Sequence, residues 1–175
     1  MPLLRAPLSQ AELSELASLF REICAWIATH KKTNPLACHI QFPKLPPTFS
    51  ESIAVHCAET LFPGAKKIRL GGGADIQIEI QGSNKKIEVK ATQKDFQHLS
   101  QKDISADYLV WIDFADCFHA GSQRVKIYVL PDPKTIFAES GRITMNTFLR
   151  AAAGRLTRYE AEIDHLIAGA ITKSP

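Results

Sequence analysis

Two stretches of strictly alternating apolar and polar residues, Asp75 to Ile80 and Ile87 to Thr92, constrain this chain more than any other feature. Alternation with a period of two residues predicts β-strands that are buried on one face. Residues 81–85, QGSNK, lie between them and tolerate turn dihedrals, so the strands are predicted to pair as a hairpin. Gly71 to Gly73 separate this hairpin from another predicted strand at 66–70.

The polar faces of the two strands carry two carboxylates and a lysine. Asp75 begins the first strand, and Glu88 and Lys90 share the polar face of the second. Cleavage of a phosphodiester needs a cation on the phosphoryl oxygens, carboxylates that hold this cation, and a group that activates or orients water. Mg²⁺ suits such a site because it needs few protein oxygens, and Mn²⁺ is a substitute. We therefore expect Asp75 and Glu88 to bind the metal and Lys90 to position or deprotonate the water.

Asp75 followed by Glu88-Val89-Lys90 resembles the motif of the PD-(D/E)xK nucleases, which share the restriction-endonuclease-like fold. The resemblance covers about residues 48–130, with Ala74 where many members have proline. It implies an α/β fold with a central mixed β-sheet flanked by helices, and Mg²⁺-dependent cleavage of double-stranded DNA. Restriction enzymes, Holliday-junction resolvases and repair nucleases use this site. Among them, we expect a small homodimeric type II restriction endonuclease.

A charged hairpin also occurs without any catalytic role, because opposite charges on adjacent strands stabilise a sheet by roughly 0.2 to 1 kcal/mol per pair. The alternative function is therefore a catalytically inactive DNA-binding or assembly module. A symmetric turn centred on Ser83 and Asn84 would place Glu88 opposite Glu79 instead of Asp75. Joint metal binding would then require a bulge or a bend near the three glycines.

A glutamate on the predicted helix from Phe49 to Leu61 is a further candidate catalytic residue. Many resolvase-like members of the resembled family carry a glutamate on the helix before the sheet, and Glu51 lies at about this distance from Asp75. Residues 48–51, TFSE, also form a capping box, in which Glu51 would satisfy backbone donors instead. Both interpretations of Glu51 remain open.

Cations near the predicted site are candidate phosphate contacts. The proposed DNA-binding residues are Lys66, Lys67, Arg69, Thr92 and Lys94. A basic edge strand that discourages aggregation would give the same pattern at 66–70. The C-terminal segment contains four more candidates, which would otherwise lie on a solvated helix: Arg142, Arg150, Arg155 and Arg158.

The length of 175 residues predicts a single nuclease domain. We divide it into an N-terminal helix with an irregular connection at 1–47, a catalytic core at 48–130 and a C-terminal helical segment at 131–175. The formal net charge of +3 permits nucleic-acid binding without requiring it.

The N-terminal helix is predicted to begin at the capping box of Ser9 and Glu12 and to end near His30. Its apolar stripe packs on the body of the protein or forms a dimer contact, and it consists of Leu13, Leu16, Phe20, Ile23 and Ile27. After the hairpin we expect a helix at 93–104 and strands at 107–114 and 124–130.

Helices are expected throughout the C-terminal segment. One should lie around Met145 to Ala153, and the last should begin at a capping box formed by Thr157 and Glu160. The chain shows no basic start followed by an apolar run and no apolar stretch long enough to span a bilayer. We therefore expect a cytoplasmic protein that does not enter the membrane.

Overall fold

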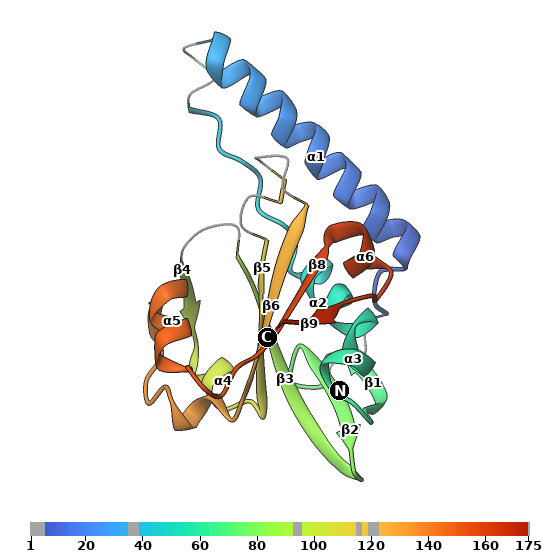
Figure 1. Ribbon diagram of the computed structural model, residues 1–175, viewed down its shortest axis with the longest axis vertical. Coiled ribbons are helices and arrows are strands. Elements are labelled where there is room, and N and C mark those ends of the chain that lie inside the picture. The colour runs from blue at the N-terminus through green and yellow to red at the C-terminus, as the bar shows by residue number, and fades with distance from the viewer. Residues whose placement is uncertain (1–5, 35–38, 93–95, 115–116, 119–122, 175) are drawn as a thin grey trace.

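The computed structural model describes residues 6–34, 39–92, 96–114, 117–118 and 123–174. A mixed sheet of seven strands in the order β1-β2-β3-β5-β6-β8-β9 forms its centre, with helices against it (Figure 1). β3 and β5 run parallel, and every other neighbouring pair in this sheet is antiparallel. The expectation of an α/β fold with a central mixed sheet flanked by helices is confirmed.

The bounds of the elements follow the chain in order. The N-terminal half contains α1 Gln10–Thr33, α2 Pro47–His56, α3 Ala58–Leu61, β1 Lys66–Leu70, β2 Ile76–Ile80 and β3 Ser83–Thr92. The remainder contains β4 Phe96–Leu99, α4 Gln101–Ile104, β5 Tyr108–Asp113, β6 Arg124–Pro131, the 3-10 turn η2 Pro133–Thr135, β7 Gly141–Thr144, α5 Met145–Ala151, β8 Thr157–Glu162, α6 Ile163–Ile167 and β9 Thr172–Lys173.

The two faces of the sheet carry separate cores. On one face, alternate residues of β2, β3 and β5 pack with α1, α2 and α6 in the larger core, which includes Ile78, Val89 and Ile112. On the other face, Leu109 and Trp111 of β5 begin a smaller core. This smaller core continues into β6, β4, α4, β7 and α5.

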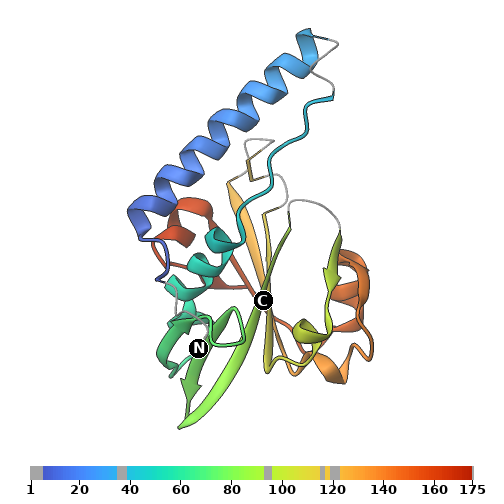
Figure 2. The ribbon, with the colours of Figure 1, turned by 180° about the vertical axis from the view of Figure 1, so that it is seen from behind.

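A second layer therefore covers part of the face that carries the smaller core. β4 and β7 form a separate two-stranded sheet, and they lie with α4 and α5 on one side of the central sheet (Figures 1 and 2). Lys90 of β3 is paired with Trp111, so the polar side chains of β3 lie beside this layer. The alternation predicted burial of one face of the hairpin, but Glu88 and Thr92 on the polar face are buried as well.

Three elements begin or lie where local sequence signals predicted them. The Ser9 and Glu12 capping box is present at the start of α1. β1 occupies the predicted positions, and α5 begins at Met145 as expected. These elements agree with prediction because capping groups and residue periodicity act over only a few neighbours.

Three other expectations are wrong. Residues 96–99 form β4, paired with β7, where a helix was predicted, and among the described residues of 93–104 only those of α4 are helical. Thr157 and Glu160 do not begin a helix; they belong to β8, which pairs with β6. The segment 131–175 consequently contributes strands as well as helices. In each case, pairing with a strand distant in sequence outweighs the local helical signal.

Candidate functional site

The hairpin of β2 and β3 has a shorter turn than the sequence suggested. Ile80 pairs with Ser83, so only Gln81 and Gly82 connect the strands. Both have positive φ, 51° and 78°, as in the tight turns that match the twist of paired strands. Ser83 and Asn84, predicted to be the turn, instead belong to β3.

This turn sets the register of the acidic residues. Ile76 pairs with Ile87, so Asp75 lies one residue before the last pair, next to Glu88. Glu79 faces Asn84, and the expectation that it would face Glu88 is wrong. The hairpin itself therefore brings the two predicted metal ligands together, and no bulge between them is needed.

A glycine loop leads into Asp75. Gly71, Gly72 and Gly73 all have positive φ, which side chains with a Cβ rarely adopt. The Gly71 amide donates to the Asp75 carbonyl at 3.0 Å, and the Gln77 side chain donates to the Gly72 carbonyl. This loop fixes the backbone immediately before β2.

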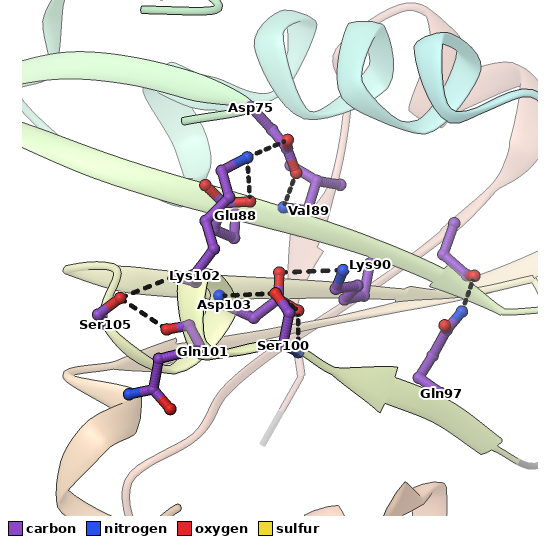
Figure 3. Close-up of polar contacts among 11 residues, drawn as sticks. Asp75, Glu88, Val89, Lys90, Gln97, Ser100, Gln101, Lys102, Asp103 and Ser105 are labelled. Carbon is purple, nitrogen blue, oxygen red and sulfur yellow. Dashed lines mark hydrogen bonds and ion pairs between the residues drawn. The ribbon is translucent and has the colours of Figure 1, made fainter. Parts of the chain in front are cut away.

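The two carboxylates share one cationic group. Lys102 Nζ lies 3.1 Å from Asp75 Oδ1 and 2.8 Å from Glu88 Oε2 (Figure 3). The second oxygen of Asp75 accepts a hydrogen bond from the Val89 amide at 2.9 Å. Asp75 is thus hydrogen-bonded to β3, and the Lys102 ammonium bridges it to Glu88.

Lys102 reaches this position from α4, a helix of one turn. Ser100 caps it, because the Asp103 amide donates to Ser100 Oγ and the Ser100 amide donates to Asp103 Oδ2 at 2.6 Å. The other oxygen of Asp103 lies 2.9 Å from Lys90 Nζ (Figure 3). One short helix therefore supplies a cation to the acidic pair and an anion to Lys90.

Burial makes the acidic pair electrostatically unfavourable. Glu88 has a side chain only 3% exposed. Burial, and to a smaller extent the neighbouring Asp75, raises the pKa of Glu88 to about 7, although Lys102 acts in the opposite direction. Burial alone would lower the pKa of Lys102, but its bonds to Glu88 and Asp75 raise it. The site therefore favours a bound cation.

The donor set fits Mg²⁺. Asp75 and Glu88 present carboxylate oxygens to a single cation position, and Mg²⁺ is commonly bound by one or two carboxylates together with water and phosphate. Lys102 is the group that would have to leave, and its side chain is 51% exposed, so it has room to move into solvent. The described side chains thus supply two carboxylate ligands with one ammonium group between them.

Glu51 does not complete a larger carboxylate site. Within residues 6–34, 39–92, 96–114, 117–118 and 123–174, no group of three or more His, Cys, Asp or Glu side chains could hold a metal ion. The capping-box role of Glu51 is wrong, because α2 begins at Pro47 after Pro46 and has no side-chain cap. Its catalytic role stays a prediction. Glu51 lies half-buried on the second turn of α2.

The predicted DNA contacts occupy different environments. Lys66, Lys67 and Arg69 are exposed on β1, where Lys67 Nζ pairs with Glu79 Oε2 at 2.7 Å. Thr92 is 4% exposed, so it does not offer a free hydroxyl to DNA. Lys94 lies outside the described residues.

The C-terminal arginines do not share one helix face. Arg142 lies on β7, Arg150 on α5 and Arg158 on β8. Arg155 donates to Thr135 Oγ1. Arg158 lines a surface pocket of about 320 Å³ with Lys126 and Tyr128.

Sequence reasoning missed Lys102 and Asp103. Lys102 was expected only as an exposed residue of the predicted helix from 93 to 104. It is exposed, but it also bridges the two acids. One available signal was Ser100-Gln101-Lys102-Asp103, a capping pattern like the one correctly used at the start of α1. That pattern indicates where α4 begins, but not which strand its lysine reaches.

None of the described helices combines the length and apolar content needed to cross a bilayer. No protein-family model matches this chain, and comparisons with curated proteins and with solved structures give no match either. The resemblance to the PD-(D/E)xK nucleases therefore depends on the motif residues Asp75, Glu88 and Lys90 and stays a prediction.

Proposed function

We propose that this protein is a Mg²⁺-dependent endodeoxyribonuclease of the PD-(D/E)xK type. The observation that carries the proposal is the convergence of Asp75 and Glu88 on one cation position, at 3.1 and 2.8 Å. Lys90, the last residue of the motif, lies two residues after Glu88 on the same face of β3. The order of elements supports the restriction-endonuclease-like fold, with α2 before three antiparallel strands and β5 returning parallel to β3.

Each residue has a distinct role in the proposed site. Asp75 and Glu88 hold the metal, which would supply positive charge to the phosphoryl oxygens and lower the pKa of a bound water. Lys90 orients or deprotonates the attacking water, and this role requires Lys90 to be released at least partly from Asp103. Lys102, displaced from the acidic pair, is placed to contact a phosphate.

The substrate we propose is double-stranded DNA, with type II restriction as the specific activity. Cutting both strands requires two active sites, and a homodimer provides them. Lys66 and Arg69, exposed on β1 where they pair with Glu79 and Gln77 of the hairpin, are the proposed backbone contacts. Holliday-junction resolution and DNA repair use the same site chemistry and differ in how the DNA is presented.

One observation favours a second candidate, a catalytically inactive DNA-binding or assembly module. Lys102 satisfies both carboxylates, and Asp103 pairs with Lys90. The network is therefore complete without a metal. In such a module the ion pairs would hold α4 against β3.

A cleavage assay separates these functions. The full chain is incubated with unmethylated phage DNA, supercoiled plasmid and a synthetic four-way junction, in Mg²⁺, in Mn²⁺ and in EDTA. Discrete fragments indicate restriction, whereas cutting of the junction alone indicates resolution. DNA binding in a gel-shift assay without cleavage in either metal would support the inactive module.

The matched variants are Lys90→Ala and Lys86→Ala. Both lysines lie on β3, but Lys86 is exposed, whereas Lys90 is half-buried and pairs with Asp103. We expect Lys90→Ala to abolish cleavage while DNA binding remains, and Lys86→Ala to retain cleavage. Equal activity of the Lys90→Ala protein and the wild type would refute the catalytic assignment.

A further inference from the structure

A β-bulge in β1 brings cations together on one face of the sheet. Lys66 pairs with Glu79 and Arg69 pairs with Gln77, so three steps along β1 match only two steps along β2. Without the extra residue, alternation would place Lys66 and Arg69 on opposite faces of the sheet. With the extra residue, both lie opposite polar residues of β2. The bulge therefore adds a positive charge to the face that already carries Arg69.

The bulge also contains a strained lysine. Lys67 has a φ of 49°, a left-handed conformation that a residue with a Cβ adopts only at an energetic cost. From this position its Nζ lies 2.7 Å from Glu79 Oε2. A glycine would form the same bulge without the cost, so the backbone geometry does not call for a lysine here. Strain of this kind is concentrated at functional sites.

A surface pocket of about 200 Å³ lies on this face. Its lining residues are Lys67, Arg69, Gln77, Ile78, Glu79 and Asn84. The Gln77 side chain donates to the Gly72 carbonyl and is therefore engaged. Asn84 is exposed on β3 opposite Glu79, where its side-chain amide can donate to a ligand.

The pocket carries more positive than negative charge. Among the described residues that line it, the only carboxylate is that of Glu79. A hydrogen bond from Lys67, together with the charges of Lys66 and Arg69, lowers the pKa of Glu79. Three cations thus surround one anion. Because Lys67 is 62% exposed, its ion pair with Glu79 contributes little, and a stronger anion can replace the carboxylate.

The pocket and the acidic pair lie on the same face of the hairpin. Asp75, Gln77 and Glu79 alternate along β2 with the buried Ile76 and Ile78. Gln77 lies roughly 7 Å and Glu79 roughly 13 Å along the strand from Asp75. Phosphates of one DNA strand advance about 3.4 Å along the helix axis per nucleotide. A strand whose scissile phosphate lies at the acidic pair therefore reaches the pocket a few nucleotides away.

We propose that this pocket binds a backbone phosphate of DNA a few nucleotides from the scissile bond. Arg69 and Lys67 are its cationic contacts, and Asn84 is a hydrogen-bond donor. Glu79 is an internal competitor, which the phosphate displaces from Lys67. The identity of the ligand as DNA rests on the proposed function, whereas the pocket, its excess positive charge and the strained lysine are independent of it.

Fluorescence anisotropy of a short fluorescein-labelled duplex, measured in EDTA, tests the pocket without cleavage. We expect Arg69→Met and Lys67→Gly each to weaken binding about three- to tenfold and to reduce the slope of log affinity against log salt by about 1. Lys67→Gly suits the positive φ, so it removes the cation and keeps the bulge. Glu79→Gln should bind about two- to fivefold more tightly, because the phosphate no longer has to break an exposed ion pair.

The matched controls lie at the other end of the same sheet. Lys173→Met removes a positive charge from β9, and Glu160→Gln removes a carboxylate of β8 that pairs with Arg124. We expect both to bind the duplex within about twofold of the wild type. Circular dichroism and melting temperature report whether each variant is folded, and Arg69→Gln replaces Arg69→Met if that variant is not.

Two results would each overturn the pocket: an Arg69→Met protein that binds like the Lys173→Met protein, or a Glu79→Gln protein that binds no more tightly than Glu160→Gln. If the β1 variants aggregate while they keep wild-type affinity, the cations only protect an edge strand, and the proposal is wrong. Binding that follows the expected pattern without cleavage in Mg²⁺ or Mn²⁺ would count against the nuclease and leave the pocket intact. Cleavage by a wild type whose β1 variants bind normally would do the reverse.

Discussion

The burial of Glu88 predicts that the free energy of unfolding depends on pH, and this can be tested without knowing the function. Its carboxyl binds a proton more tightly in the folded protein than in the unfolded chain, because the pKa is raised from 4.5 to about 7. Between these two pH values the folded state holds more protons than the unfolded state. The free energy of unfolding should therefore fall as pH rises through this window.

The size of the effect follows from the pKa. Each tenfold change in proton affinity corresponds to about 1.4 kcal/mol, so ionised Glu88 should destabilise the fold by about 3 kcal/mol above about pH 8. Solvent screening reduces this little, because the Glu88 side chain is only 3% exposed. Glu88→Gln has nearly the shape of the protonated carboxyl, and we expect it to remove most of the penalty.

Urea unfolding at pH 5 and pH 8 measures this difference. We expect Glu88→Gln to be stabilised by about 1 to 3 kcal/mol at pH 8 and to be near the wild type at pH 5. The control is Glu79→Gln on the neighbouring strand, where a hydrogen bond from Lys67 lowers the pKa. That control should not be stabilised at pH 8. If Glu88→Gln were less stable than the wild type by the same amount at pH 5 and at pH 8, the electrostatic account of the acidic pair would be refuted.

Three further predictions concern the site and its hairpin. Lys102→Met should lower the Mg²⁺ concentration at which the melting temperature rises half-maximally, since it removes the ammonium that bridges the acids. If this Mg²⁺ concentration were unchanged, the metal and Lys102 would not compete. Asp103→Asn should lower the free energy of unfolding in urea by about 1 to 3 kcal/mol, because Lys90 loses its partner; no loss would mean that this pair contributes nothing to the fold. Gln81→Asn should raise the free energy of unfolding in urea and Gly82→Ala should lower it, each by about 0.5 to 1 kcal/mol, because both positions need positive φ; the opposite order would contradict the turn assignment.

The sequence alone determined the elements whose signals are local. Alternation identified β2 and the second half of β3, and the Ser9 and Glu12 capping box located the start of α1. The sequence also indicated that Asp75, Glu88 and Lys90 belong to one candidate site. These features depend on neighbours only a few residues away, which is the range over which periodicity and capping act.

Only the tertiary structure decided how those residues meet. The two-residue turn at Gln81 and Gly82 sets the register that brings Asp75 to Glu88. Residues 96–99 form a strand because they pair with β7, and the one-turn helix α4 that follows places Lys102 in contact with Asp75 and Glu88. Strand pairing depends on partners far apart in sequence, and a register shift of a single residue moves every side chain to the other face. The motif could therefore be identified from the sequence, whereas the position of the Lys102 ammonium between its two carboxylates follows only from the tertiary structure.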